Sequence, residues 1–334
     1  MRRVLVAISL AVLAAAPVGA RVILVPDVAN GILTVQEGMN AAVSGDTVKL
    51  AVGVFDSVYT FVTPVGVRTA ICELKNGVTL RGSVRRQSVI DHTGAQYGIL
   101  CRDIGAAARI SNLTIRGGVG RDAGREDDGD GRTLAAGIMC WENASPTIEN
   151  VSINESATGV VVRDGCAPTI RGAVIARGSH HGVYVYRNGT SPVILDHVTA
   201  VSNFDNGVYV FQGRAELTSC CVTHSGKPGI SAYDCTPSVE YCNVFLNDRT
   251  STGMPEDYAG EIDDLTGQFG NISSEPFYCD FSGAVGYDYH VCMDSPNVDA
   301  GQGGTDIGAF GGSCTACVSP VSRTTWGAIK ALYR

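Results

Sequence analysis

The chain has 334 residues, of which 45% are hydrophobic and 41 are glycine, and its formal net charge is −8. This charge argues against nucleic acid and anionic lipid surfaces as partners, and a strongly acidic polysaccharide would need local arginines or a bridging cation. The length allows either two domains or one elongated solenoid with a large apolar core.

Residues 1–20 have the pattern of a secretory signal peptide. Arg2 and Arg3 precede an apolar run, and small residues close the segment at positions 17–20. The run is too short for a membrane span, and no later segment reaches the roughly eighteen apolar residues that a span requires. We therefore expect export to the periplasm, the cell surface or the medium, without membrane insertion. The mature chain would carry a charge of −10, because Arg2 and Arg3 are lost.

Residues 21–44 are predicted to form an N-terminal lead and a capping helix. Within residues 34–43, Val35 and Met39 fall on one helical face together with Ala42 or Val43. Such a helix would close one end of a solenoid, as terminal repeats must. The following segment, Gly-Asp-Thr-Val-Lys-Leu at residues 45–50, predicts the first strand.

A glycine followed by alternating apolar residues recurs six times, in steps of 39, 22, 23, 25 and 22 residues. Inside each unit a second signal recurs, a pair of apolar residues five positions apart. The glycines are Gly98, Gly137, Gly159, Gly182, Gly207 and Gly229. The pairs are Ile110 and Ile115, Ile148 and Ile153, Ile170 and Ile175, Leu195 and Ala200, Leu217 and Val222, and Val239 and Val244.

A unit of about 22 residues with three short strands and no helical stretch can bury its apolar side chains only by stacking on the next unit. The repeat therefore predicts an all-β, three-sided parallel β-helix. A leucine-rich repeat has a similar length, but the chain lacks its leucine framework.

The helix, the Gly-Asp-Thr-Val turn, residues 77–82 and the Gly-Ile/Val repeats together resemble the bacterial exported right-handed parallel β-helix proteins, the pectate-lyase-like superfamily with PbH1-type repeats. The resemblance extends over about residues 33–312, and residues 294–312 are similar to the closing segment of such proteins. It implies a right-handed, single-stranded β-helix over residues 45–312, followed by a tail at residues 313–334. The superfamily includes lyases, hydrolases, esterases, epimerases and proteins without known activity, so the fold alone names no reaction.

Alternation places the second and fourth residues after each repeat glycine on the outer face. Six of these twelve positions are aromatic, and strands about 4.8 Å apart would bring the rings into rows. Such rows offer apolar area to sugar rings, which predicts a polysaccharide-binding wall. The alternative is that stacked rings only stabilise the sheet or lie beneath a loop. The predicted substrate-binding residues are Trp141, Arg163, Tyr184, Tyr186, Tyr209, Phe211 and Tyr233.

The longest loop, residues 117–136, precedes the same wall and is rich in Asp and Arg. It is either a functional insertion or a solvated loop. Glycosidic cleavage requires two carboxyl groups about 5 to 9.5 Å apart. The candidate catalytic residues on the rim of the wall are Asp128, Asp130, Asp164, His181 and Asp205.

Residues 179–183 resemble the Gly-His-Gly segment of polygalacturonases, but residues 155–158 lack the aspartate pair that those enzymes carry. The outward aspartates of pectate lyases and the outward Asp, Gln and Arg of pectin esterases are also missing. No active site of the superfamily is therefore intact in this chain.

We predict no metal centre and no cofactor. Residues 128–131 fail the EF-hand pattern because Arg132 takes the next ligand position. Surface Ca²⁺ at Asp127, Asp128 and Asp130, or at Glu261, Asp263 and Asp264, is the remaining metal hypothesis.

Twelve cysteines in an exported chain favour disulfides. Cys279 and Cys292 flank a predicted hairpin and are candidates to pair, and Cys314 and Cys317 are expected to form a local disulfide. Two further pairs occupy matching inward positions on successive coils, Cys101 with Cys140 and Cys220 with Cys242. Each pair forms either a disulfide or a stack of unbonded thiols. Cys166 and Cys235 are too far apart to bridge.

The leading hypothesis is an exported monomer that binds a neutral or mildly acidic polysaccharide along the aromatic wall. A second hypothesis adds cleavage as a polysaccharide lyase or glycoside hydrolase. A third is a non-catalytic structural or adhesive surface protein with no glycan site, in which the aromatic rows only stiffen the solenoid.

Residues 324–334 form either a docking or export tag or a frayed terminus.

Overall fold

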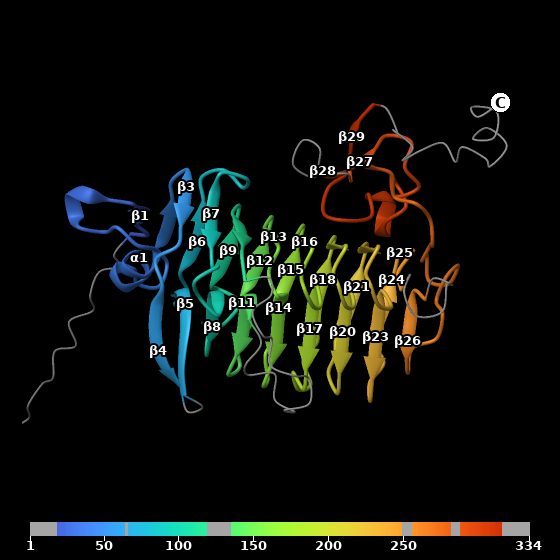
Figure 1. Ribbon diagram of the computed structural model, residues 1–334, viewed down its shortest axis with the longest axis horizontal. Helices are drawn as coiled ribbons and strands as arrows, with labels where there is room; N and C mark the ends of the chain where they lie inside the picture. Colours follow the sequence, from blue (N-terminus) through green and yellow to red (C-terminus); the bar gives the residue numbers. More distant parts are fainter. Residues whose placement is uncertain (1–18, 64–65, 119–134, 249–255, 282–287, 316–334) are drawn as a thin grey trace, which may run out of the picture.

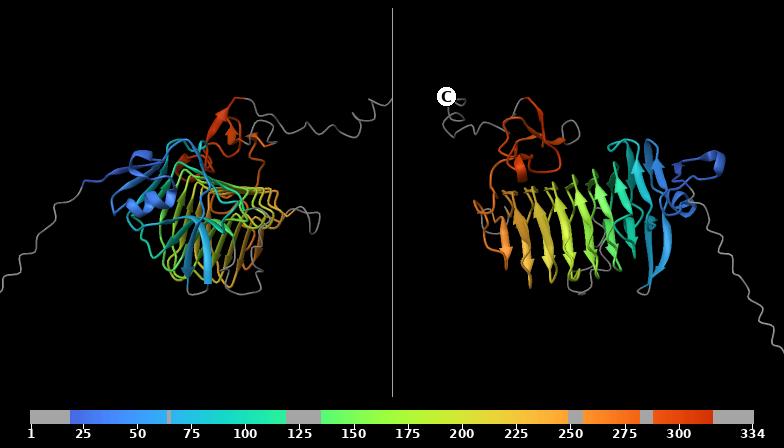
Figure 2. Two further views of the ribbon diagram at one scale, coloured as in Figure 1. Left: turned by 60° about the vertical axis from the view of Figure 1, so that its left-hand side comes forward. Right: turned by 180° about the vertical axis from the view of Figure 1, so that it is seen from behind.

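The computed structural model describes residues 19–63, 66–118, 135–248, 256–281 and 288–315. These residues wind into a long coil whose strands align in three walls (Figure 1). Figure 2, left, looks partly along the coil axis and shows successive turns superimposed. The predicted all-β, three-sided parallel β-helix is confirmed.

Wall 1 contains nine parallel strands. In spatial order they are β1 (Val22–Val25), β2 (Thr47–Leu50), β6 (Thr79–Gly82), β9 (Arg109–Ser111), β12 (Thr147–Glu149), β15 (Thr169–Arg171), β18 (Val193–Asp196), β21 (Ala215–Thr218) and β24 (Ser238–Glu240).

Wall 2 contains eight parallel strands. They are β3 (Gly53–Phe55), β7 (Ser88–Asp91), β10 (Thr114–Arg116), β13 (Ser152–Asn154), β16 (Val174–Ala176), β19 (Thr199–Val201), β22 (Cys221–Thr223) and β25 (Asn243–Phe245).

Wall 3 contains nine strands, of which only the first pair along the chain is antiparallel. They are β4 (Tyr59–Thr63), β5 (Gly66–Leu74), β8 (Tyr97–Arg102), β11 (Ala136–Trp141), β14 (Thr158–Arg163), β17 (Val183–Tyr186), β20 (Val208–Phe211), β23 (Ile230–Tyr233) and β26 (Tyr258–Gly260).

The repeat glycines stand one above another where the chain turns from wall 2 into wall 3. The residues that follow Gly159, Gly182 and Gly207 are paired in register across neighbouring coils. A Cβ on Gly182 would lie 2.5 Å from the carbonyl oxygen of Gly207, so there is no room for a side chain. Glycine is therefore required at this corner by the close approach of successive coils.

The pairs of apolar residues five positions apart face the core from walls 1 and 2. Ile170 and Ile175 are both buried, and Gly172, the first of the two residues between the strands, has a positive φ of 54°. Asn150 and His197 occupy the same place in neighbouring coils, with φ of 52°. A single left-handed residue thus makes the corner between walls 1 and 2, which explains the constant spacing of five.

Helix α1 (Val35–Ala41) confirms the predicted capping helix. Thr34 and Glu37 form a capping box, in which each side chain accepts a hydrogen bond from the other residue's backbone N–H. Val35 and Met39 are buried in the main core, so the helix covers its N-terminal end. A short 3-10 helix, η1 (Val28–Asn30), precedes it.

A small C-terminal sheet packs on the outer face of wall 2 rather than over the end of the coil (Figure 2). It contains β27 (Tyr278–Asp280), β28 (Asp288–Cys292) and β29 (Gly312–Cys314), and the 3-10 helix η3 (Gln302–Gly304) precedes β29. Ile307 of the predicted closing segment is fully buried there against Val174 and Val201. The closing segment therefore covers one side of the solenoid.

The predicted disulfides Cys279–Cys292 and Cys314–Cys317 are wrong. Cys279 is bonded to Cys314, with the two Cα atoms 5.9 Å apart, and Cys292 is also disulfide-bonded. β28 pairs with both β27 and β29, so these two strands, which are distant in sequence, belong to one small sheet, and the disulfide links them. The stacked cysteines of the core are unbonded thiols.

Candidate functional site

The aromatic side chains of wall 3 form rows on its outer face, as predicted. Tyr184 is paired in register with Tyr209, and Tyr186 with Phe211, which in turn is paired with Tyr233. The rings of Tyr186 and Phe211 stack with centroids 5.6 Å apart and an interplanar angle of 9°. These rings lie in an apolar cluster separate from the main core.

Exposure of the rings increases toward the C-terminal coils. Trp141, Tyr184 and Tyr186 are only 5%, 5% and 6% exposed, whereas Tyr233 is 41% exposed. Tyr209 and Phe211 are half-buried. We call Tyr209, Phe211 and Tyr233 the aromatic strip, because all three residues are at least partly exposed to solvent.

The buried part of the wall is more apolar than sequence reasoning recognised. Leu100, Met139 and Val161 face outward and are fully buried, and they pack with Phe61 and Tyr97. Alternation predicts the direction of a side chain but not whether another segment covers it. The binding role of Trp141, Tyr184 and Tyr186 therefore stays a prediction.

A row of charged side chains stands at the edge where the chain enters wall 3. His180, Asp205 and Lys227 occupy equivalent positions in three successive coils, and we call them the charged row. Oδ2 of Asp205 lies 3.2 Å from Nδ1 of His180, and its Oδ1 lies 2.9 Å from Nζ of Lys227. Burial favours the neutral carboxyl, but the hydrogen bonds from His180 and Lys227 outweigh it and lower the pKa of Asp205 to about 2. Asp205 is thus an ionised group at neutral pH, unsuited to donate a proton.

His181 directly follows His180 of the charged row in sequence, and its ring packs against the aromatic strip. Its ring stacks on Tyr209 with centroids 4.9 Å apart, and it lies 5.4 Å from the ring of Tyr184. Its Nδ1 accepts a hydrogen bond from the backbone N–H of Asn206, which places the proton of the neutral ring on Nε2. His181 is only 3% exposed, so its main role is to pack against the neighbouring rings.

Asp164 and Arg163 lie at the opposite edge of wall 3. Nε of Arg163 donates to Oδ2 of Asp164 at 2.8 Å, and the guanidinium lies 5.7 Å from the ring centre of Tyr186. A strand of six residues separates this edge from the charged row, which at about 3.3 Å per residue is roughly 20 Å. The structure therefore does not bring Asp164 within cleavage distance of Asp205. Asp128 and Asp130 lie outside the described residues.

A second polar row borders the strip at this edge and was missed by sequence reasoning. Nε of Arg187 donates to Gln212 at 2.6 Å, and the amide of Gln212 donates to Asp234 at 2.8 Å. Each of these residues directly follows a wall 3 strand, and each has a positive φ. We call Arg187, Gln212 and Asp234 the polar row. Their signal in the sequence is one polar residue per coil directly after the outward aromatic position.

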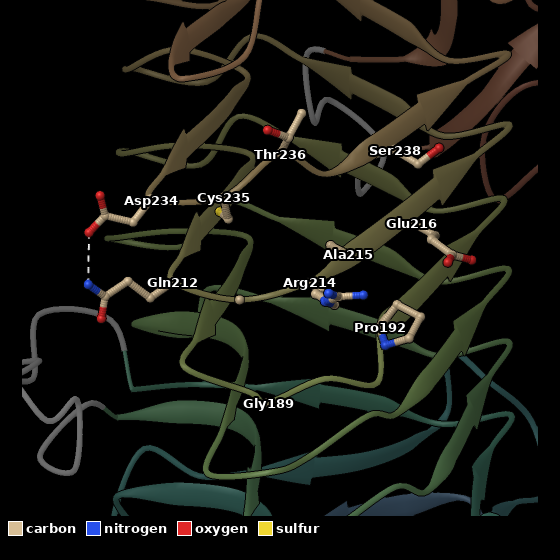
Figure 3. Close-up of a pocket in the computed structure, with 11 residues that line it drawn as sticks. Gly189, Pro192, Gln212, Arg214, Ala215, Glu216, Asp234, Cys235, Thr236 and Ser238 are labelled. Carbon is tan, nitrogen blue, oxygen red and sulfur yellow. Dashed lines mark hydrogen bonds between the residues drawn. The ribbon is translucent and has the colours of Figure 1, made fainter.

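A groove of about 550 Å³ runs from the polar row toward wall 1 (Figure 3). Gln212 and Asp234 form one side of it, while Arg214 and Glu216 reach in from the turn and from β21. The groove extends the solvent-accessible polar surface away from the aromatic strip.

The described residues contain no group of three or more His, Cys, Asp or Glu side chains placed to hold a metal ion. Glu261, Asp263 and Asp264 thus form no such group. Within the same residues, no helix has the length and apolar character needed to cross a membrane.

A family model described as right handed beta helix region matches residues 69–219 and 136–262, which together cover more than half of the chain. The chain belongs to the right-handed β-helix family. No curated protein sequence shows significant similarity to it.

Solved structures with a similar coil include pectate lyase Pel9A, with 13% identity, a TM-score of 0.49, and coverage of 89% of this chain and 97% of the lyase. The A-module of Azotobacter vinelandii mannuronan C-5 epimerase AlgE4 has 16% identity and a TM-score of 0.34, and the match covers 64% of this chain and 73% of the module. The A-module of AlgE6 from the same organism has 14% identity and a TM-score of 0.32, with coverage of 68% and 76%. At these values the likenesses assign no activity to this chain.

Proposed function

We propose that the chain is an exported β-helix protein that binds a neutral or mildly acidic polysaccharide on the aromatic strip. The observation that carries the proposal is the exposure of Tyr233 beside Tyr209 and Phe211, with the ring centroids of Tyr209 and Tyr233 only 5.7 Å apart. Adjacent flat rings on a rigid wall offer apolar faces to the C–H faces of sugar rings, and a tyrosine hydroxyl can form hydrogen bonds.

The two rows at the edges of wall 3 supply the polar contacts that a sugar needs. The charged row offers an ammonium group on Lys227, whose side chain is 53% exposed. The polar row offers the exposed amide of Gln212 and the carboxylate of Asp234. Because both signs of charge are present, the site favours a neutral or weakly charged glycan over a polyanion.

Export is part of the same proposal. The first twenty residues have the composition of a signal peptide. The disulfide between Cys279 and Cys314 fits an oxidising compartment.

The test is affinity electrophoresis of the mature chain through a panel of polysaccharides, followed by calorimetry with the best ligand. Tyr233→Ala is expected to weaken binding about 2- to 12-fold, the equivalent of a ring contact of ~0.5–1.5 kcal/mol. Phe269→Ala is the matched control, since Phe269 is an aromatic residue 64% exposed outside wall 3. Equal affinity of the Tyr233 variant, the control and the parent would refute the proposal.

A structural or adhesive protein without a glycan site is the second candidate, and the burial of Trp141, Tyr184 and Tyr186 favours it. Rings that are covered contribute to stability rather than to recognition. This candidate predicts that no polysaccharide in the panel is retained by the strip, while Tyr184→Ala lowers the melting temperature.

Cleavage of the bound glycan stays a prediction that rests on Asp128, Asp130, Asp164, His181 and Asp205. Release of reducing ends or unsaturated products from any retained polysaccharide would establish it. Asp205→Asn and Asp164→Asn then identify whether either carboxylate takes part, since activity unchanged in one variant removes that residue from the reaction.

A further inference from the structure

A second polar groove lies on wall 2, away from the aromatic strip. It has a volume of about 320 Å³ and is bounded by wall 2 on one side and by the C-terminal sheet and its closing segment on the other. Four arginines line it, and we call it the arginine groove. They are Arg85, Arg86, Arg116 and Arg177.

Three of the four guanidinium groups already have a carboxylate partner. Arg86 is 3.2 Å from Asp288, and Arg116 is 3.0 Å from Asp91. Arg177 is 2.6 Å from Glu155.

Arg85 is different. Within the described residues its guanidinium has no hydrogen bond or ion pair, and it lies 4.0 Å above the ring centre of Phe310. The side chain is half-buried, and burial together with the neighbouring Arg86 lowers its pKa. The charge of Asp288 partly offsets this lowering, but no carboxylate of the described residues pairs directly with Arg85. A partly desolvated cation without a direct ion pair, held on an aromatic ring, is a favourable position for an anionic ligand.

The neutral lining of the groove is suited to a sugar. Thr114, Ser152 and Asn154 face outward from β10 and β13, and their hydroxyl and amide groups line the groove beside the arginines. These groups can bind ring hydroxyls, while a guanidinium binds a carboxylate in bidentate geometry. The volume lies at the small end of the range of about 300–1,000 Å³ for small-molecule sites, which fits one sugar residue better than a long chain.

We infer that the arginine groove binds a uronic-acid residue of an acidic glycan, with its carboxylate on Arg85. A negatively charged protein needs local arginines to hold such a ligand, and this groove provides them. The site is separate from the aromatic strip, so neither proposal depends on the other.

Calorimetry of the whole mature chain with short galacturonate and mannuronate oligosaccharides tests the inference. A neutral glucose oligosaccharide of the same length, inorganic sulfate and inorganic phosphate serve as comparison ligands. We expect binding of a uronate oligosaccharide that weakens as salt rises, and no binding of the neutral one. Arg85→Gln should lower the affinity at least tenfold. Arg109→Gln, which removes a half-exposed arginine of wall 1 paired with Glu149, should not change it.

Because Arg85 also contacts Phe310, its replacement could loosen the C-terminal sheet. Asn154→Trp keeps all four arginines and fills the groove, so it should lower the affinity equally without lowering the melting temperature. Tyr233→Ala should leave uronate binding unchanged, which separates this site from the strip. The inference is overturned if the parent chain binds no uronate oligosaccharide, if Asn154→Trp leaves binding within twofold of the parent, or if sulfate and phosphate bind as well as the sugar.

Discussion

The ring of Tyr186 stacks on the ring of Phe211 in the next coil, and the guanidinium of Arg187 lies 5.1 Å and 5.9 Å from their respective centres. Neighbouring coils are thus joined on their outer face by side chains as well as by backbone hydrogen bonds. Such contacts have measurable coupling energies.

We expect Tyr186→Ala and Phe211→Ala to be less destabilising together than the sum of the two single changes. The coupling energy should be about 0.5–1.5 kcal/mol, since each single variant already removes the stacked pair. Urea unfolding of the parent, the single variants and the double variant measures it. Additive effects within error would show that the stack contributes nothing beyond burial.

The lowered pKa of Asp205 predicts that the free energy of unfolding falls in acid. Its pKa is lowered from 3.8 to about 2, because hydrogen bonds from His180 and Lys227 outweigh the opposing effect of burial. The stabilisation is therefore fully present above about pH 4 and is lost as the pH falls through 2, and its size is about 2 kcal/mol.

Asp205→Asn should accordingly be destabilised relative to the parent at pH 6, and the difference should shrink between pH 4 and pH 2. Chemical unfolding at a series of pH values provides the measurement. Asp234→Asn serves as a control at the other edge of wall 3. A difference that is constant over this pH range would contradict the predicted pairing.

Gly182→Ala should be strongly destabilising, because the new Cβ would lie 2.5 Å from the carbonyl oxygen of Gly207 and 2.8 Å from the amide of Asn203. Forcing a methyl group into a packed site costs about 1–3 kcal/mol or more. Gly105→Ala is the control, since its nearest neighbour would be the Asn76 side chain at 3.8 Å. Thermal unfolding should show a clear loss for the first variant only.

The free cysteines should differ sharply in reactivity. Burial raises the pKa of Cys72 to about 12 and that of Cys221 to about 11, whereas Cys235 is partly exposed beside the groove of Figure 3. Mild alkylation of the native protein should therefore modify Cys235 before any other free cysteine of the described residues. Mass spectrometry of peptides identifies the labelled thiol, and Cys235→Ser should abolish the early label. Early labelling of Cys140 or Cys220 would show that the core opens readily.

Much of the coil could be predicted from residue spacing. Gly159 and Gly182 mark the corner before wall 3 because only glycine fits there. Ile170 and Ile175 mark the corner between walls 1 and 2, because a two-residue turn with one left-handed residue joins the two strands. These constraints act within a single coil or between neighbours, so they leave a regular trace in the sequence.

The candidate site was harder to predict, because its properties depend on contacts between distant segments. The alternation that turns Tyr184 outward also turns Tyr233 outward, yet one ring is covered and the other is open. The disulfide of Cys279 depends on strand pairing in the C-terminal sheet. The arginine groove is formed partly by Tyr289 and Phe310, which are distant in sequence from Arg85, and no local pattern indicates that contact.

The stacking of equivalent glycines also bears on how this protein could evolve. A duplicated unit of 22 to 25 residues would find the same neighbours above and below that the existing units have, so whole coils can be gained or lost without redesigning the core. Variation in length among descendants of this chain should then occur in whole-coil steps, and every added coil would lengthen each wall by about 4.8 Å.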